Sequence, residues 1–290
     1  MPVDTGAAER FVHANARVLD RHRLAVLLHG ASPAPALQAL RAYRNPDGGF
    51  GHALEPDVRA PHSESASTLH ALDILAEVGA GDDPMVRDAA AWLGTIADTG
   101  GGIPLVLPTA ATHPHAPWMV PSDGGSFLTF ALAARLWDAR STDPWLARGT
   151  DWCWTRLEHR DGLGGYWVKF ALEFLDHVPD RQRAEAAIDR LGALLGGDGS
   201  LPVPGGLEGE RLTPLELSPR PGLRSRRLFT NRQIDADLDA LECRQRSDGG
   251  WTISFLEWSP GQGIEWRGMM TLQAVGTLAG HRRIRLPKSE

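Results

Sequence analysis

Apolar residues recur along this chain with the 3.6-residue period of α-helices, in segments that end at glycine or proline. Residues 11–29 carry one such face, and a second helix opens at Pro33 and runs to Tyr43. The same pattern predicts amphipathic helices over residues 84–97, 144–159, 181–195 and 232–245. More completely apolar helices, which are typical of buried positions, are predicted from Ser63 or Ser65 as N-cap and over 126–137, 166–178 and 265–280. No stretch alternates convincingly like a strand.

A short frame recurs where the amphipathic helices end. It consists of a leucine, a glycine eight positions later, and a large apolar residue two positions after the glycine. Its four clear copies are Leu40, Arg44, Gly48, Phe50; Leu93, Ala97, Gly101, Ile103; Leu191, Leu195, Gly199, Leu201; and Leu241, Gln245, Gly249, Trp251. A looser copy has Trp154, Glu158, Gly162 and Tyr166. A spacing of about 50 residues is typical of repeat architectures, in which each unit buries its apolar face on its neighbours.

The alternation of the two helix types predicts the architecture. An amphipathic helix leads into each glycine turn, and a more apolar helix follows it. This order favours two concentric rings, with apolar helices inside, in an all-α, α/α-toroid fold of about 11–12 helices. The repeats leave no room for a boundary, so we expect one domain over residues 1–290, with a long irregular Pro/Arg-rich arm at 202–231.

Composition narrows the class of protein. Hydrophobic content of 42% and charged content of 23% are typical of a soluble globular chain, and a net charge of −6 argues against nucleic acid as a partner. Two cysteines are too few for a disulfide scaffold. We recognise neither a signal peptide nor a membrane-spanning stretch, so the expected location is cytoplasmic. Ten tryptophans provide large apolar rings that can line a ligand cavity.

The frame at 241–251 resembles the repeat motif of squalene–hopene and oxidosqualene cyclases, which share an α/α toroid with protein prenyltransferase β subunits. The turn at 47–51 and the Ser/Thr-rich segment that begins at Ser65 extend the resemblance, which covers about residues 35–280. It implies the toroid fold, and it implies that Gln245 and Trp251 tie the ends of outer helices together.

The chain departs from that family at the residues that carry its chemistry. The Asp-x-Asp-Asp motif, with which class II cyclases protonate an alkene or epoxide, is absent. The nearest segment, Asp235–Asp239, lies on a predicted outer helix, and we interpret it as a solvated face. Asp151 and Cys153 have the Asp-x-Cys spacing of the prenyltransferase zinc site, but Cys153 is better interpreted as a small buried apolar residue. We therefore expect no metal and no cofactor.

Catalytic candidates come from the arms and helix starts that would meet at a central cavity. They are Asp57, Glu55, His62 and Glu64, and among them the Glu55 and Asp57 pair with His62 is favoured, because paired titrating groups can be driven apart in pKa. A carboxyl group buried among apolar rings has a raised pKa and can act as a general acid. The alternative is structural, with Asp57 paired to Arg59 and His62 helping to cap a helix.

Substrate-binding candidates lie near the same junctions. They are Trp118, Asp123, Tyr166, Trp258, Glu265, Trp266, Arg224 and Arg226. Aromatic faces would stabilise a carbocation, although inner helices are apolar in any case. Arginines of the long arm could bind a diphosphate, or they could form an ordinary solvated loop. His113 and His115 lack the spacing expected of metal ligands.

Three functional hypotheses follow. The first is a terpenoid-cyclase-like enzyme that acts by acid catalysis on an isoprenoid-like or other hydrophobic small molecule in a central apolar cavity. The second is a non-catalytic protein that binds an apolar small molecule in that cavity. The third is an α/α-barrel carbohydrate-active enzyme, which needs two carboxylates at glycosidase separation. Substrate, product and oligomeric state stay open at this point.

Overall fold

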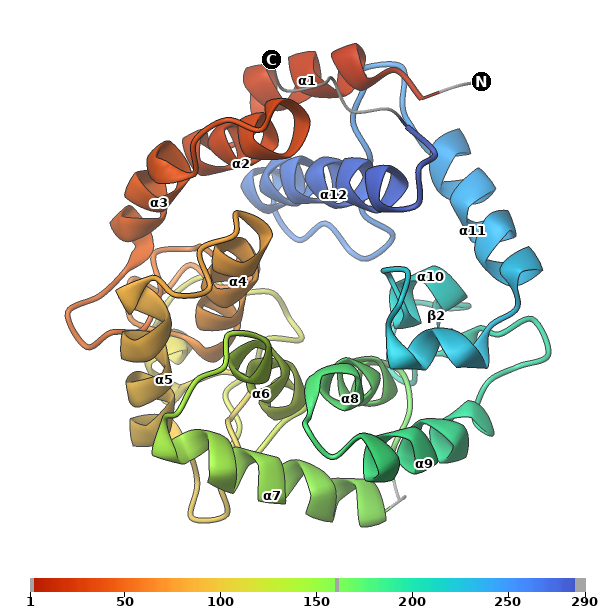
Figure 1. Cartoon of the computed structure of the whole chain (residues 1–290). Helices are drawn as coiled ribbons and strands as arrows, with labels where there is room; N and C mark the ends of the chain where they lie inside the picture. Colours follow the sequence, from red (N-terminus) through yellow and green to blue (C-terminus); the bar gives the residue numbers. More distant parts are fainter. Residues whose placement is uncertain (1–2, 160–161, 285–290) are drawn as a thin grey trace. The chain divides into compact units, whose positions relative to one another are not determined.

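The computed structural model describes residues 3–159 and 162–284, and this part of the chain is all-α (Figure 1). Its regular structure comprises twelve α-helices, three short 3-10 helices and one two-residue strand pair. The chain divides into two compact units. Unit 1 comprises residues 1–39 and 195–290, and unit 2 comprises residues 40–194.

Unit 2 is a two-layered helical unit. The helices α4 (Ser65–Glu77), α6 (Leu128–Asp138) and α8 (Tyr166–His177) pack side by side in one layer, and α5 (Pro84–Ile96), α7 (Pro144–Glu158) and α9 (Arg181–Gly192) cover them (Figure 1). Two 3-10 helices complete the unit, η1 (Arg41–Tyr43) and η2 (Pro108–Thr112). Every residue from Leu128 to Ala134 is buried, because α6 has helices on several sides. The apolar composition of this segment therefore predicts its position correctly.

Unit 1 is organised around α12 (Pro260–Gly280), which packs on α1 (Thr5–Asn15) and α2 (Val18–His29) and also contacts α11 (Asn231–Cys243). The end of α3 (Ala34–Leu40) marks the boundary between the units. The long arm forms the antiparallel pair β1 (Leu201–Pro202) and β2 (Arg211–Leu212), the short α10 (Pro214–Leu217) and η3 (Arg224–Leu228). The helix α10 packs on α11.

Four glycine turns, two in each unit, share the same backbone hydrogen bonds. In each, one residue donates its N–H to the carbonyl four positions later and accepts the N–H of the glycine three positions later. The first residues of these turns are Asn45, Asp98, Gly196 and Arg246. The glycines have φ between +81° and +97°, where a side chain is strained. At Gly48 a Cβ atom would also lie only 2.7 Å from a backbone carbonyl oxygen of α5.

The turns are tied to the helices that follow them. The N–H after the glycine pair donates to a threonine hydroxyl on the next apolar helix in three cases: Phe50 to Thr68 (3.1 Å), Ile103 to Thr129 (2.8 Å) and Trp251 to Thr271 (3.0 Å). The threonine hydroxyl is the acceptor for a buried turn N–H that lies outside any helix and so has no partner within a helix. This bond therefore fixes where the chain enters α4, α6 and α12.

Gln245 has the tying role that the resemblance implies. Its amide exchanges two hydrogen bonds with the backbone of Asp4, at 2.8 and 2.9 Å, and donates to the carbonyl of Gly249 at 2.9 Å. The indole of Trp251 donates to the carbonyl of Leu241. Gln245 thus joins the start of α1 to the turn after α11, and Trp251 bonds this turn back to α11 itself.

Three sequence predictions about helix bounds are wrong. Residues 11–29 form two helices rather than one, with a break at Ala16 and Arg17. The break lets Arg17 contact the fully buried Asp20 at 2.8 Å, where Arg23 also binds at 2.9 Å. The N-cap of α4 is Glu64, not a serine.

The third error concerns α12, which begins at Pro260 rather than at residue 265. Ser259 caps it by accepting the N–H of Gln262, and proline is favourable at the first helical position. Glu265 consequently lies within the helix and not at its start.

Candidate functional site

The catalytic candidates lie where two irregular arms of unit 2 meet the start of α4. The arm at 52–63 pairs with the arm at 104–118 through backbone hydrogen bonds. Arg59 donates to the carbonyl of Pro114 (2.9 Å), and Ala116 donates to the carbonyl of Asp57 (2.8 Å). An isolated bridge joins Val58 and His115. Segments about 55 residues apart in the sequence are thus held together beside one helix terminus.

Glu64 is the most buried of the candidate acids, with 1% of its surface exposed. Its backbone N–H donates to the carbonyl of Phe50 at 2.8 Å, which fixes its position at the entrance to α4. Its carboxyl group accepts the N–H of Leu107 at 3.0 Å and the hydroxyl of Thr109 at 3.2 Å. Burial raises the pKa of Glu64 to about 7, although these two hydrogen bonds act in the opposite direction.

Glu55 and Asp57 are also buried, each with 5% exposure. The carboxylate of Glu55 lies 2.6 Å from the Nε2 atom of His70 and accepts the N–H of Asp57 at 3.0 Å. The N–H of Glu55 donates to the hydroxyl of Ser67 on α4. The arm is therefore fixed to α4 through Glu55, and Glu55 already has an imidazole partner.

His62 is exposed and lies at the edge of this cluster. Its ring contacts that of His113 edge-on, with centroids 5.7 Å apart. It does not cap α4, because the capping position belongs to Glu64 and no side chain accepts a hydrogen bond there. In the described part of the chain, no three His, Cys, Asp or Glu side chains are arranged to hold a metal ion.

The sequence prediction missed several residues of this site. His70, Leu107 and Thr109 all contact the candidate acids, and none was singled out. His70 follows Glu64 on α4, and its position between the apolar residues Leu69 and Ala71 is a signal that the sequence does contain. The contacts of Leu107 and Thr109 depend on an arm more than 40 residues away from Glu64.

Tyr166, at the first position of α8, belongs to an aromatic cluster in unit 2. Its ring lies 6.1 Å from Phe127 and 6.4 Å from Phe170, and the last two rings stack at 5.4 Å. The ammonium group of Lys169 lies over Tyr166 and Phe170, at 5.8 and 5.6 Å. The aromatic cluster is therefore already in contact with one cation, the ammonium group of Lys169. Two other candidates, Trp118 and Asp123, are exposed.

The remaining candidates belong to unit 1. Trp266, on α12, contacts Phe255 edge-on at 5.3 Å, and Trp258 is half-buried. Arg226 donates to the Nε2 atom of His281 at 3.0 Å. Burial, helped by the charges of the nearby arginines, lowers the pKa of His281, so the neutral ring accepts this bond.

Glu265 and Arg224 are also half-buried members of unit 1. Glu265 lies in the second turn of α12, and Arg224 is the first residue of η3. The proposed binding of a diphosphate by Arg224 and Arg226 stays a prediction.

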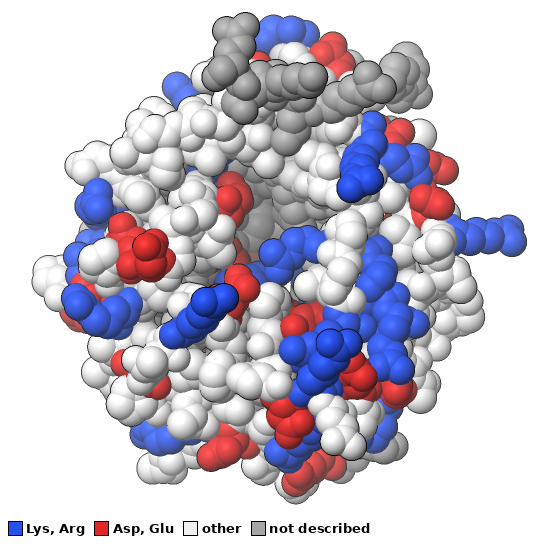
Figure 2. Space-filling view, in the orientation of Figure 1, with Lys and Arg blue, Asp and Glu red and all other residues white. Residues whose placement is uncertain are grey.

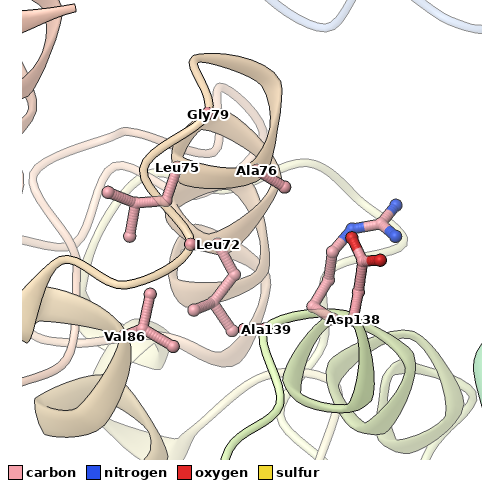
Figure 3. A pocket seen from close by; sticks show the side chains of 9 residues that line it. Leu72, Leu75, Ala76, Gly79, Val86, Asp138 and Ala139 are labelled. Carbon is pink, nitrogen blue, oxygen red and sulfur yellow. The ribbon is translucent and has the colours of Figure 1, made fainter.

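A pocket of about 200 Å³ opens in unit 2 near the ends of α4 and α6 (Figure 3). Its lining residues are Leu72, Leu75, Ala76, Gly79, Gly81, Val86, Arg135, Asp138 and Ala139. Glu64 precedes α4, whereas Gly79 follows its last turn, so the pocket and the carboxyl cluster lie toward opposite ends of this helix. The pocket is therefore not the space beside the predicted catalytic residues.

Arg135, in the pocket wall, connects the three helices of its layer. It forms ion pairs with Asp73 of α4 and Glu173 of α8. These carboxylates raise the pKa of Arg135 further above its ordinary value, against the effect of burial. The guanidinium thus remains charged and serves as a structural centre of unit 2.

In the view of Figure 2, Lys and Arg gather to the right of the centre, where Asp and Glu border them, and elsewhere the two signs are scattered among larger neutral areas. No described helix is both long enough and apolar enough to cross a membrane.

Known structures resemble this chain, whereas its sequence matches no protein-family model and no curated protein. A protein from Actinoplanes aligns with a TM-score of 0.58 and 19% identity, over 95% of this chain and 99% of that one. A variant of the type II terpene cyclase MstE from Scytonema, in complex with its product merosterolic acid A, aligns with a TM-score of 0.56 and 17% identity, over 96% and 87% of the two chains. The apo form of MstE aligns with a TM-score of 0.52 and 17% identity, over 96% and 88%.

This similarity shows the fold. The chain has a terpenoid-cyclase-like, all-α fold, in agreement with the resemblance drawn from its sequence. The concentric rings and the central cavity expected from the sequence stay predictions.

Proposed function

We propose that this chain is a terpenoid-cyclase-like enzyme in which Glu64 is the general acid. The observation that carries the proposal is the state of the Glu64 carboxyl group: it is 1% exposed, and its pKa is raised to about 7. A general acid works best when its pKa lies near the operating pH, because it then carries a proton and releases it readily. Glu64 meets this condition near neutrality.

Glu64 is a better candidate than the other acids of the cluster. Its hydrogen-bond partners, Leu107 and Thr109, are neutral, and no described side chain places a cation on its carboxyl group. The carboxylate of Glu55 instead already has a partner, the Nε2 atom of His70 at 2.6 Å. We therefore assign the acid to Glu64 and a positioning role to Glu55, which holds the arm that carries Asp57.

The chemistry would be an isomerisation of a hydrophobic polyene. Transfer of the Glu64 proton to an alkene carbon forms a C–H bond and leaves a carbocation on the adjacent carbon. A second alkene of the same molecule attacks this cation and closes a ring, and loss of a proton to a base ends the sequence. One proton is added and one is lost, so the product is an isomer of the substrate. Tyr166 and the rings stacked around it would stabilise a cation.

The structural neighbours support an isoprenoid-like substrate. MstE was solved with geranylgeranyl dihydroxybenzoate as its substrate, in a variant that aligns with this chain at a TM-score of 0.53 and 16% identity, over 94% and 87% of the two chains. We propose the same class for this chain: a hydrophobic molecule with an isoprenoid tail. The non-catalytic binding protein and the carbohydrate-active enzyme are not favoured by these neighbours.

The test is turnover of geranylgeranyl dihydroxybenzoate, followed by mass spectrometry and chromatography of isomeric products. We expect Glu64→Gln to reduce turnover by about 10²-fold or more, the usual contribution of a general acid. The matched control is Glu77→Gln, at the exposed end of the same helix, which should keep the wild-type rate. Wild-type turnover in Glu64→Gln would remove Glu64 from the mechanism. No turnover by the wild-type protein would remove this substrate class.

A further inference from the structure

The first turn of α4 is buried, yet its hydrogen-bond donors lack acceptors. Glu64 occupies the N-cap position, but its side chain does not cap the helix. In the described part of the chain, the backbone N–H groups of Ser65, Ala66 and Ser67 have no acceptor. These three residues have 0%, 6% and 1% of their surface exposed. Buried N–H groups of this kind are normally satisfied by a side chain, by water or by a ligand.

A fourth donor in the same turn, a side-chain hydroxyl, is also unsatisfied. The hydroxyl of Ser65 is fully buried, and no described group lies within hydrogen-bonding distance of it. A buried hydroxyl without a partner is unfavourable, and such groups are rare in native structures. Four neighbouring donors, three N–H groups and one hydroxyl, are therefore available at one helix terminus.

The start of α6 shows how the chain satisfies an equivalent position. Ser126 donates its backbone N–H to the carbonyl of Ile103, and Glu64 donates its own to the carbonyl of Phe50. Both acceptors directly follow a glycine pair. The hydroxyl of Ser126 then accepts the N–H of Leu128, the first residue of α6, at 3.2 Å. At α4 an acid replaces this serine, and its carboxyl group turns to the second arm. The hydroxyl that accepts one N–H at the start of α6 thus has no counterpart at α4, where an acid lies beside an open set of donors.

We propose that the first turn of α4 binds a carboxylate group of the ligand, through the N–H groups of Ser65, Ala66 and Ser67 and the hydroxyl of Ser65. Helix N-termini bind anions because their free N–H groups and the helix dipole both favour negative charge. All four donors are neutral, and Glu64 is adjacent. A carboxylate carries one charge, whereas a phosphate carries about 1.5 to 2, so the site fits the carboxylate better.

This proposal refines the substrate class. It rests on the proposed function in assigning the carboxylate to an isoprenoid-like molecule, which would then be an acid rather than an alcohol or a diphosphate. The donors would hold its charged end next to Glu64, and so fix how deeply the molecule enters. The binding energy of this charged group would orient the polyene, although the group itself takes no part in the reaction.

The test uses two saturated probes that cannot be cyclised, phytanate and phytanol, with affinities measured by calorimetry. We expect phytanate to bind the wild-type protein at least tenfold more tightly than phytanol. Ser65→Ala should weaken phytanate binding about tenfold, the effect of losing one hydrogen bond to a charged group, and leave phytanol unchanged. Ser65→Thr, which keeps the hydroxyl, should restore the preference. Ser126→Ala, the matched control in α6, should leave the ratio of the two affinities unaltered.

Equal affinity for the two probes would overturn the proposal. An unchanged ratio in Ser65→Ala would also overturn it and would assign the donors to ordered water. Tighter binding of phytyl phosphate than of phytanate would show a phosphate site instead. Because the probes are saturated, these outcomes do not depend on catalysis. The wild-type protein could prefer phytanate over phytanol while the Glu64→Gln variant keeps the wild-type rate of turnover. That pair of results would refute the role of Glu64 as general acid and leave the carboxylate site supported.

Discussion

The raised pKa of Glu64 makes a prediction about stability that is independent of any substrate. The ordinary pKa of the group is 4.5, and in the folded protein it is about 7. Between these values the folded protein retains a proton that the unfolded chain has released. The free energy of unfolding therefore includes a contribution that is complete below pH 4.5, falls as the pH rises, and is lost above pH 7.

The magnitude follows from the two pKa values. They differ by 2.5, and at about 1.36 kcal/mol for each pKa unit the contribution is about 3 kcal/mol. Solvent does not screen it appreciably, because Glu64 is 1% exposed. Glutamine cannot ionise, so Glu64→Gln should lose this dependence on pH. The free energy of unfolding of the variant minus that of the wild-type protein should therefore be about 3 kcal/mol larger at pH 8 than at pH 4.5.

Urea denaturation of both proteins at pH 4.5 and pH 8 checks this prediction. At each pH, the free energy of unfolding of the wild-type protein is subtracted from that of the variant, and the two differences are compared. The contributions of all other titrating groups cancel, because both proteins contain them. The amide also loses a hydrogen bond with Leu107 or Thr109, but this loss is the same at both pH values and cancels too. Glu77→Gln provides the control. A change below about 1 kcal/mol would refute the raised pKa, and with it the reason for choosing Glu64 as the acid.

Two further predictions concern the scaffold of unit 2. Arg135→Met should destabilise the protein by about 2–3 kcal/mol at pH 8 in urea denaturation, because Asp73 and Glu173 lose their cation. The loss should be smaller at pH 5, because burial raises the pKa of Glu173 and this carboxyl group then accepts a proton more readily. An equal effect at both pH values would contradict this account. Gly48→Ala should lower thermal stability more than Gly79→Ala: both glycines have positive φ, but only at Gly48 does the added methyl group meet a carbonyl oxygen. Equal losses would show that the close approach has no cost.

The sequence predicts the helices well where local chemistry decides their bounds. α5 runs over Pro84–Ile96 against a predicted 84–97, because Asp83 caps it and Pro84 starts it. The prediction of helix bounds fails where contacts with residues distant in the sequence determine them. The break between α1 and α2 depends on Asp20, which is buried between two arginines. The start of α4 depends on Glu64, whose side chain is directed to another arm.

The candidate site was predicted in part. The arm that contains Glu55 and the start of α4 do lie together, as a turn followed by a helix implies. The choice among the acids was not predictable, because it depends on which carboxyl group meets an imidazole and which meets only neutral donors. Those partners are His70, 15 positions from Glu55 on α4, and Thr109, 45 positions from Glu64. Sequence spacing contains no information about either contact.

The pairing of the two arms affects how this site can change during evolution or in the laboratory. Arg59, Ala116 and Asp57 join the arms with main-chain atoms, which every residue other than proline supplies equally. Side chains such as those of His62 and His113 can therefore be exchanged without loss of the frame that positions them. A library that randomises these two positions while retaining Glu64 should yield a high proportion of folded variants. It would allow new substrates to be selected without the scaffold having to be redesigned.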